Sequence, residues 1–578
     1  MQQRKLWLFL RRHVPIFQWL PAYGAGELRG DVFAGLTVGI MLIPQGMAYA
    51  LLAGMPPIYG LYAALLPMLI YAVFGSSRQL SVGPVAVMSL LVAESVGQLA
   101  GEGTGEYLTY AFTLALLVGV IQIIFGLFRL GFLVNFLSRP VISGFSSAAA
   151  VIIGASQLKH VLGLSVPRFA FVGDTLEALW GQLPQVNITT LLIGAIGLLV
   201  ILILRKKTGL FPVPLVVVVA GILAVWLLNL DFRGVAVVGE VPSGLPALSL
   251  PYFDWITLRR LFPMALTIAA VGFIQSIAIA KKMRERHRNY YLKPNQELFS
   301  LGAANVLGAF FSAFPVTGGF ARSVVNDQAG AKTPLAGVIA AGVVALTLLF
   351  LTPLFYYLPN AVLAAIILGA VIKLFDVATA VHLWRTDRRD FILLLATFFS
   401  TLFLGIEEGI LVGVALSVAM MVFFSTRPHV AELGRIPGTT HYRNVRRFDD
   451  LEERPEVLIV RFDSQLYFAN VEFFQQHLDM LIARKGKALR LIVLNFYAVT
   501  SVDSTAVDAL QERYQALQKR GIQLYFAGVT GPVRDAFKRW EFLKATTRPV
   551  FFVSIADALD YYDTQQLPSD GAYALQAN

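Results

Sequence analysis

One arginine, Arg322, follows a proline and two glycines in the middle of a chain that consists largely of long apolar segments. An arginine at the centre of a bilayer costs about 2.5 to 3.5 kcal/mol on insertion scales and more when it faces lipid. We therefore expect Arg322 to face a cavity lined by protein. A second apolar segment, far upstream, also begins at a Gly-Pro break, Gly83-Pro84. Two broken segments in corresponding halves of a membrane protein indicate a transporter's binding site.

The composition indicates an integral membrane protein. Of 578 residues, 56% are hydrophobic and only 14% are charged, whereas about 25% are charged in an average soluble domain. The net charge of +11 comes largely from short connections between apolar runs, such as Lys281 to Arg288 and Arg385 to Arg389. This is the positive-inside pattern of membrane proteins, and no nucleic-acid-binding motif accompanies it. The absence of cysteine excludes disulfides and thiol catalysis.

A bilayer core needs about 20 apolar residues per helix, and on that measure about fourteen segments lie between Asp31 and Thr426. The polar stretch from Asn229 to Trp255 separates two sets of about seven. With the N-terminus inside, the basic connections all lie on one side, which predicts that both termini are cytoplasmic. If the two halves share a fold, an odd number of segments per half means that the second half is inverted relative to the first. The third and tenth segments, Pro84 to Ala100 and Gly319 to Gly330, would then enter the bilayer from opposite sides.

The composition changes to that of a soluble α/β module after Arg427-Pro428. Short apolar runs that are typical of buried strands alternate there with amphipathic helical stretches, which predicts a sheet covered by helices. We therefore expect a transmembrane domain over residues 1–427 and a cytosolic module over residues 428–578, with a flexible tail from Pro568. The predicted strands are Val457–Phe462, Leu489–Phe496, Ile522–Val529 and Val550–Val553, and the predicted helices are Val471–Lys485, Ser504–Lys519 and Pro532–Phe542.

Several distinctive motifs occur in order along the chain. They are Leu42-Ile43-Pro44-Gln45-Gly46-Met47-Ala48-Tyr49-Ala50, Ser81-Val82-Gly83-Pro84, Phe320-Ala321-Arg322-Ser323, Ala329-Gly330-Ala331-Lys332-Thr333-Pro334, Leu404-Gly405-Ile406-Glu407-Glu408-Gly409, Leu466-Tyr467-Phe468-Ala469-Asn470 and Thr500-Ser501-Val502-Asp503-Ser504-Thr505. Together these motifs resemble the SulP sulfate permease family, whose animal relatives include prestin and pendrin. The C-terminal module resembles the STAS domain of that family, and the resemblance covers nearly the whole chain.

The resemblance implies a polytopic α-helical membrane protein with a seven-plus-seven inverted repeat, core and gate domains, and a homodimeric assembly. It also implies that an anion binds between the half-helices of the third and tenth segments. Carried over to this sequence, the anion-binding residues are Gln45, Tyr49, Pro84, Val85, Ala86, Gln275, Gly319, Phe320, Ala321, Arg322 and Ser323.

The residues at the two breaks are physically suited to an anion. Backbone N–H groups at a helix start lack partners within the helix, and the macrodipole there is equivalent to about half a positive charge. Two such ends and Arg322 would offer about two positive charges. Pro84 suits the first turn of a helix, where its missing N–H costs nothing. Alternatively, these prolines and glycines mark packing kinks, and backbone carbonyls hold Arg322.

Two positions depart from the family pattern. Some members carry a carboxylate in the first or eighth segment, which a proton or sodium ion can use for coupling, whereas Gln45 and Gln275 cannot titrate. We expect a uniporter or an exchanger of counter-anions, or coupling through another acid such as Asp327. Ala321 replaces a serine that relatives often have, so one hydroxyl near the anion is missing.

In the C-terminal module, Ser504 and Thr505 are candidates for regulatory phosphorylation, because related anti-sigma-factor antagonists are phosphorylated there. A phosphate at a helix N-terminus is physically favourable. Capping of the helix by Asp503 or Ser504 explains the same residues and is the favoured interpretation.

The leading hypothesis is a secondary transporter that moves a small anion by alternating access. Sulfate is the first choice of substrate, and bicarbonate, chloride or a dicarboxylate are the alternatives. An anion channel or voltage-responsive protein of the same fold is the second class. A nucleobase transporter is disfavoured, because such proteins use carboxylates to bind the base and lack the terminal module. The sequence lacks an enzyme's nucleophile and base, metal-ligand spacing or phosphate-binding loop, so we expect no enzymatic activity, cofactor or metal.

Overall fold

The computed structural model describes residues 14–565 apart from 133–137, 168, 170, 208–212, 253, 288–289, 373 and 543–549. The tail expected from Pro568 onward lies outside the described residues. The chain divides into two compact units, residues 1–417 and 418–578. The division falls within one helix, α18, which runs from Ile406 to Thr426.

The first unit is helical, and a helix overlaps each apolar segment predicted from the sequence. Two further helices of ten residues, α8 and α16, were not predicted. The helices are α2 (Ile16–Trp19), α3 (Ala25–Leu52), α4 (Ile58–Phe74), α5 (Ala86–Gly97), α6 (Gly105–Leu127), α7 (Arg139–Leu162), α8 (Val172–Gly181), α9 (Ile188–Lys207), α10 (Val213–Leu228), α11 (Trp255–His287), α12 (Pro294–Ala309), α13 (Phe320–Gln328), α14 (Leu335–Leu346), α15 (Asn360–Val371), α16 (Val377–Thr386), α17 (Arg388–Phe403) and α18.

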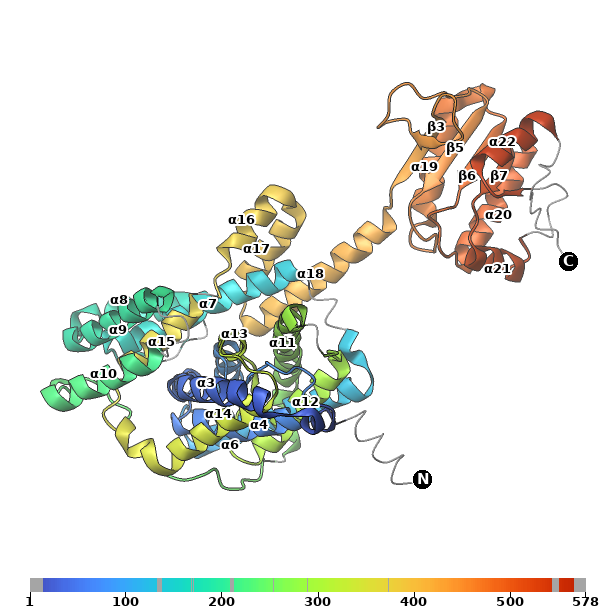
Figure 1. The fold of residues 1–578 in the computed structure, drawn as a ribbon. Coiled ribbons are helices and arrows are strands. Elements are labelled where there is room, and N and C mark those ends of the chain that lie inside the picture. Colours follow the sequence, from blue (N-terminus) through green and yellow to red (C-terminus); the bar gives the residue numbers. More distant parts are fainter. Residues whose placement is uncertain are drawn as a thin grey trace. The chain divides into compact units, whose positions relative to one another are not determined.

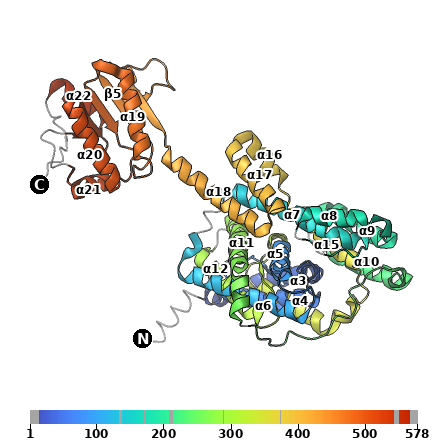
Figure 2. The ribbon, with the colours of Figure 1, turned by 180° about the vertical axis from the view of Figure 1, so that it is seen from behind.

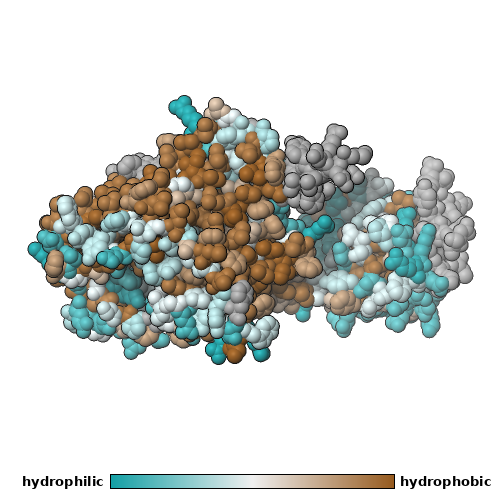
Figure 3. Space-filling view, turned by 90° about the horizontal axis from the view of Figure 1, so that it is seen from below, coloured by the Kyte–Doolittle hydropathy of each residue, from teal (hydrophilic) through white to brown (hydrophobic). Residues whose placement is uncertain are grey.

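Several of these helices have the length and composition of membrane spans. In the described residues, six spans are long and apolar enough to cross a membrane, and five shorter apolar helices accompany them. Large apolar side chains such as Leu192, Ile196 and Phe350 are more than half exposed. Figure 3 shows apolar side chains over a broad part of the helical unit's surface. A surface of this kind fits lipid better than water, so the fold is that of a helical membrane protein.

The helices of the first unit form two groups (Figures 1 and 2). One group contains α3 to α6 and α11 to α14, and the other contains α7 to α10 and α15 to α17. Within the first group, α3 and α4 pack closely at Gly46 and Gly60. A Cβ added to Gly60 would lie only 1.8 Å from the carbonyl oxygen of Gly46, so only glycine permits this approach.

The two broken segments meet in space. Each contributes a two-residue strand, β1 (Val82–Gly83) and β2 (Thr317–Gly318), and the two strands pair antiparallel with Val82 opposite Gly318. Helix α5 begins three residues after β1, and α13 begins two residues after β2. The pairing therefore holds the starts of two half-helices side by side, although more than two hundred residues separate them in the chain.

The second unit is a six-stranded mixed sheet in the order β4-β3-β5-β6-β7-β8. The strands β5 to β8 run parallel, and β3 pairs antiparallel with both β4 and β5. The elements are β3 (Val430–Arg435), β4 (Tyr442–Asn444), β5 (Val457–Phe462), α19 (Val471–Lys485), β6 (Leu491–Asn495), α20 (Ser504–Lys519), β7 (Gln523–Ala527), α21 (Gly531–Arg539), β8 (Phe551–Phe552) and α22 (Ile555–Thr564).

Both faces of this sheet carry a core. Leu458 and Val460 of β5 face one cluster, which includes side chains of α19, α20 and α21, and Val457 and Ile459 face a second cluster with α22. This burial on both faces explains the continuous apolar runs that identified the strands. The predicted α/β module with four strands and three helices is confirmed, whereas β3, β4 and α22 were not predicted.

Candidate functional site

The candidate site is built where α5 and α13 begin. The backbone N–H of Gly319, the N-cap of α13, donates to the carbonyl of Ser81 at 2.9 Å. In return, the N–H of Ser81 donates to the hydroxyl oxygen of Ser323 at 2.9 Å. Ser323 thus joins the first turn of α13 to the strand that leads into α5, and these bonds extend the pairing of β1 with β2.

Arg322 points into this junction and is only 2% exposed. Its Nη1 atom donates to the carbonyl oxygen of Pro84 at 2.6 Å. Its Nε and Nη2 atoms are buried and have no hydrogen-bond partner among the described residues. Within that same part of the chain, no carboxylate forms a salt bridge with Arg322. A buried charge without a counter-charge is costly, so this arrangement favours a bound anion.

Two glycines make room for the guanidinium group. A Cβ added to Gly319 would lie 2.7 Å from Cζ and 2.8 Å from Nη2 of Arg322. At Gly83, an added Cβ would lie 3.3 Å from Nη2, and the φ of +157° there also favours glycine. The missing side chains of Gly83 and Gly319 therefore leave the space that the guanidinium group of Arg322 occupies.

Pro84 differs from its predicted position. Helix α5 begins at Ala86 with Val85 as its N-cap, so the expectation that Pro84 lies in the first turn is wrong. Pro84 lies before the cap, and its carbonyl accepts the hydrogen bond from Arg322. A proline cannot donate a hydrogen bond from its backbone nitrogen, so Pro84 contributes its carbonyl to the site. This hydrogen bond agrees with the alternative interpretation in which backbone carbonyls hold Arg322.

The other predicted residues lie on three helices near this junction. Gln45 and Tyr49 are buried one turn apart on α3. Gln275 is half-buried on α11. In the first turn of α13, Ala321 is half-buried, whereas Phe320 is 45% exposed, and Lys282 Nζ lies 5.0 Å from the centre of its ring.

Sequence reasoning missed three buried polar residues that hold β2 in place. The hydroxyl of Ser276 accepts from the N–H of Gly318 at 2.8 Å and lies 2.7 Å from the hydroxyl of Thr317. Thr317 donates to the carbonyl of Gly272 at 2.6 Å. Asn305 bonds both the N–H and the carbonyl of Val316, at 2.8 and 3.1 Å. In the sequence, each of them is a polar residue within an apolar segment. That pattern alone does not identify the hydrogen-bond partner of the side chain.

Asp327, the candidate coupling acid, lies in the last turn of α13. Its carboxylate is 7% exposed and pairs with Arg286 at 2.8 Å and with His287. Asp327 therefore already has two partners, Arg286 and His287, at the end of α11. It lies on the helix that carries Arg322 but at the opposite end.

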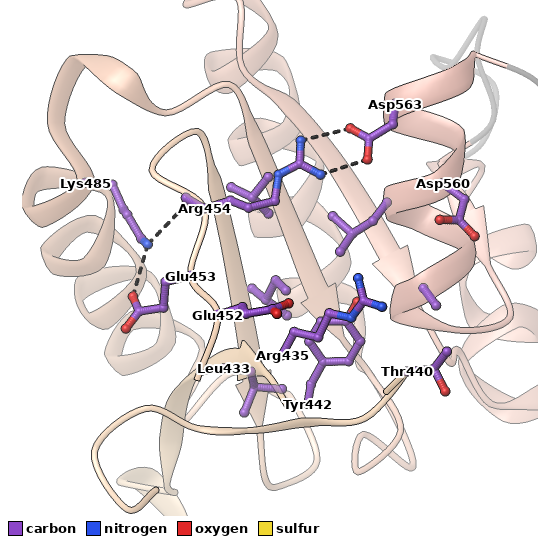
Figure 4. A pocket seen from close by; sticks show the side chains of 14 residues that line it. Leu433, Arg435, Thr440, Tyr442, Glu452, Glu453, Arg454, Lys485, Asp560 and Asp563 are labelled. Atoms are coloured by element: carbon purple, nitrogen blue, oxygen red, sulfur yellow. Dashed lines mark hydrogen bonds and ion pairs between the residues drawn. The ribbon is translucent and has the colours of Figure 1, made fainter. Parts of the chain in front are cut away.

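The C-terminal module contains a cavity of about 230 Å³ between β3, β4 and α22 (Figure 4). Arg454 makes two hydrogen bonds of 2.8 Å to Asp563, and these bonds hold the pKa of that carboxyl below its usual range. Lys485 pairs with Glu453 at 3.3 Å. The charged side chains that line the cavity are Arg435, Arg454, Lys485, Glu452, Glu453, Asp560 and Asp563. Acids and bases nearly balance there, so this cavity does not favour a small anion.

The proposed phosphorylation residues lie at the start of α20. Asp503 is the N-cap, and its carboxylate accepts hydrogen bonds of 2.9 Å from the N–H groups of Ala506 and Phe468. Ser504 and Thr505 are the first two residues of the helix, and Thr505 is exposed. Capping by Asp503 therefore accounts for this motif, and regulatory phosphorylation remains a proposal.

Comparison with known proteins identifies the family of both units. The model of the sulfate permease family matches residues 28–397, and that of the STAS domain matches residues 450–558. Sulfate transporter 4.1, chloroplastic, of Arabidopsis thaliana is 41% identical over 94% of this chain and 82% of its own length. High affinity sulfate transporter 2 of Stylosanthes hamata is 34% identical over 97% of this chain and 88% of its own length.

Solved structures agree with this result. Murine Solute Carrier 26 family member A9, an anion transporter in the inward-facing state, matches with a TM-score of 0.89 and 28% identity over 96% of this chain and 95% of its own. The transmembrane domain of the cyanobacterium bicarbonate transporter BicA matches with a TM-score of 0.60 and 27% identity over 68% of this chain and 98% of its own. The chain is therefore an integral membrane protein that ends in a STAS domain, and it belongs to the sulfate permease family, a family of transporters rather than enzymes.

Proposed function

We propose that this protein is a secondary active transporter that binds a small anion between the starts of α5 and α13 and moves it by alternating access. The observation that carries the proposal is Arg322, which is buried at both helix starts with two nitrogen atoms unpartnered among the described residues. Sulfate is the favoured substrate, because the relatives described above are named sulfate transporters.

Backbone amides complete the proposed site. The N–H groups of Ala86 and Val87 in α5, and of Phe320 and Ala321 in α13, lie in first turns and have no acceptor within their own helices. Each helix start contributes about half a positive charge, and Arg322 contributes one. About two positive charges suit a divalent anion such as sulfate, and also leave room for bicarbonate, chloride or a dicarboxylate.

The exposed Phe320 indicates the route by which an anion reaches the site. Its ring is accessible in the first turn of α13, and Lys282 near the end of α11 lies against it. In the proposed topology this end of α11 is cytoplasmic, so we propose that an anion reaches the site from the cytoplasmic side. The group of helices that contains α5 and α13 would then act as the core domain and carry the anion past the group that contains α7 to α10 and α15 to α17, the gate domain. Coupling would use a counter-anion, a proton or a sodium ion. We further propose a homodimer in the cell's inner or plasma membrane, with both termini and the STAS domain cytoplasmic.

Uptake of a panel of labelled anions into proteoliposomes tests this function. We expect saturable sulfate uptake by the wild type and counterflow driven by internal unlabelled sulfate. Arg322→Ala should reconstitute normally but lose most uptake, and Arg322→Lys should be intermediate, because lysine keeps the charge but not the guanidinium's planar array of donors. Near-normal uptake by Arg322→Ala would contradict the site. Flux without saturation or counterflow would favour the anion channel or voltage-responsive alternative.

A further inference from the structure

The short helix α16 connects two membrane helices and presents an exposed apolar face, although the ring of Trp384 also contacts Phe391 of α17. It follows α15 and precedes α17, and none of its residues is buried. Val377, Val381 and Trp384 are 54%, 45% and 55% exposed. Their spacing of four and three residues places them on one side of the helix. The exposed Ile372 and Phe375 precede them in the connection from α15.

Arginines follow this apolar face. Arg385 and Arg388 are exposed, and Cζ of Arg388 lies 5.5 Å from the centre of the Trp384 ring. Among the residues that the structure describes, no carboxylate forms a salt bridge with Arg385 or Arg388. The nearby acid Asp387 instead caps α17, where it accepts a hydrogen bond of 2.9 Å from the backbone N–H of Arg389.

Two hydrogen bonds join the start of α16 to α7. The hydroxyl of Ser143 donates to the carboxylate of Asp376, the N-cap of α16, at 3.2 Å. The backbone N–H of Asp376 donates to the hydroxyl of Ser147 at 3.1 Å. The helix is therefore held in place, and its exposed side is a fixed feature of the surface.

We propose that α16 lies in the cytoplasmic membrane interface and that Arg385 and Arg388 bind the phosphate groups of anionic phospholipids there. Tryptophan is enriched at membrane interfaces, and helices with an apolar face and a basic polar face lie in the interfacial plane. Guanidinium groups bind phosphate oxygens through paired hydrogen bonds. The positive-inside pattern of the same arginines puts this surface on the cytoplasmic side.

The positive charge of this surface favours anionic phospholipids as its ligand. A surface made only of Val377, Val381 and Trp384 would fit any lipid or a second protein. The arginines beside it, which form no salt bridge among the described residues, favour an anionic headgroup. Because Asp376 joins α16 to α7, bound lipid would hold the group of helices that contains α7, α16 and α17 at a fixed depth in the membrane.

Lipid-dependent thermal unfolding of the purified full-length protein tests the inference without relying on transport. Phosphatidylglycerol added to detergent micelles should raise the unfolding midpoint of the wild type more than phosphatidylcholine does. The double variant Arg385→Gln/Arg388→Gln should need roughly 25 times more phosphatidylglycerol for the same stabilisation, because each basic residue contributes about a fivefold factor. The matched control Arg446→Gln/Arg447→Gln removes two exposed arginines from the C-terminal module and should respond as the wild type does.

Further measurements distinguish a lipid site from other uses of this surface. In phosphatidylcholine alone, the double variant should unfold at the wild-type temperature, since both side chains are exposed. Equal stabilisation of the wild type and the double variant by phosphatidylglycerol would overturn the inference. Stabilisation of the wild type by inorganic phosphate to the same extent as by phosphatidylglycerol would also overturn it. A loss of oligomer in the double variant, with no change in lipid response, would assign this surface to a second copy of the chain and also refute the lipid site.

Discussion

Replacement of Gly319 by alanine tests whether the position of the guanidinium group determines anion binding. The backbone at this position, with φ of −95° and ψ of 119°, is open to any residue, so alanine adds a methyl group without backbone strain. That methyl would lie 2.7 Å from Cζ of Arg322, whereas ordinary contact begins at 3.4 Å. The guanidinium must therefore retreat by about 0.7 Å, the difference between these distances.

A retreat of this size disturbs a short, charged hydrogen bond. Arg322 Nη1 lies 2.6 Å from the carbonyl oxygen of Pro84, and any anion bound by Nε and Nη2 would lose alignment at the same time. A hydrogen bond to a charged group contributes about 1.5 to 3 kcal/mol, so we expect anion affinity to fall by about 10- to 100-fold. The protein should still fold, because the displaced group is the end of a flexible side chain.

Concentration-dependent sulfate uptake in proteoliposomes measures this effect. The control is Gly342→Ala on α14, where an added Cβ meets nothing within 4 Å. We expect the control to match the wild type and Gly319→Ala to show a higher KM. Wild-type KM and maximal uptake in Gly319→Ala would refute the idea that this guanidinium position is needed.

Three other variants test supporting contacts. Ser276→Ala removes the acceptor for the buried N–H of Gly318. We expect the free energy of unfolding to fall by about 1 to 3 kcal/mol and uptake to be reduced. Unchanged thermal unfolding would show that this bond does not hold β2. Asp503→Ala should lower the unfolding free energy of the isolated module 428–578 by about 1 kcal/mol in urea, because α20 loses its cap, whereas an equal loss in Ser504→Ala would contradict capping by Asp503. Arg454→Gln should destabilise the same module by less than about 1 kcal/mol near neutral pH, since the pair with Asp563 is partly exposed. The folded-state pKa of Asp563 is lowered, so this stabilisation is present above its unfolded pKa and disappears as the pH falls through its folded value. A wild-type advantage that persists at pH 2 would contradict this assignment.

The sequence predicted most helices of the fold because a bilayer core imposes a length on each apolar segment. Arg322 could be predicted as a site residue because a charge in such a segment needs a physical reason. In contrast, β1 and β2 contain two residues each and have no strand pattern, so their pairing could not be predicted from periodicity. The position of Pro84, two residues before the start of α5 and not in its first turn, could not be predicted, because a proline fits both before and just after a helix start.

Other elements escaped prediction for different physical reasons. The strand β3 contains the buried Glu432, whose charge interrupts the apolar pattern, although Lys485 pairs with it at 3.2 Å. The helix α16 has only ten residues and is amphipathic, so its sequence pattern does not distinguish it from a polar connection. Ser276 and Thr317 are single hydroxyls in apolar surroundings, and only the fold shows that they bond to each other.

The most direct test of the account is to locate a bound anion. Selenate is a close analogue of sulfate with a heavier central atom, and a structure of the protein with selenate would place that atom directly. We predict selenate at the junction of α5 and α13, within hydrogen-bond distance of Nε or Nη2 of Arg322 and of the first-turn amides of both helices. Selenate bound elsewhere in the helical unit, with both nitrogen atoms of Arg322 still unpartnered, would contradict the account.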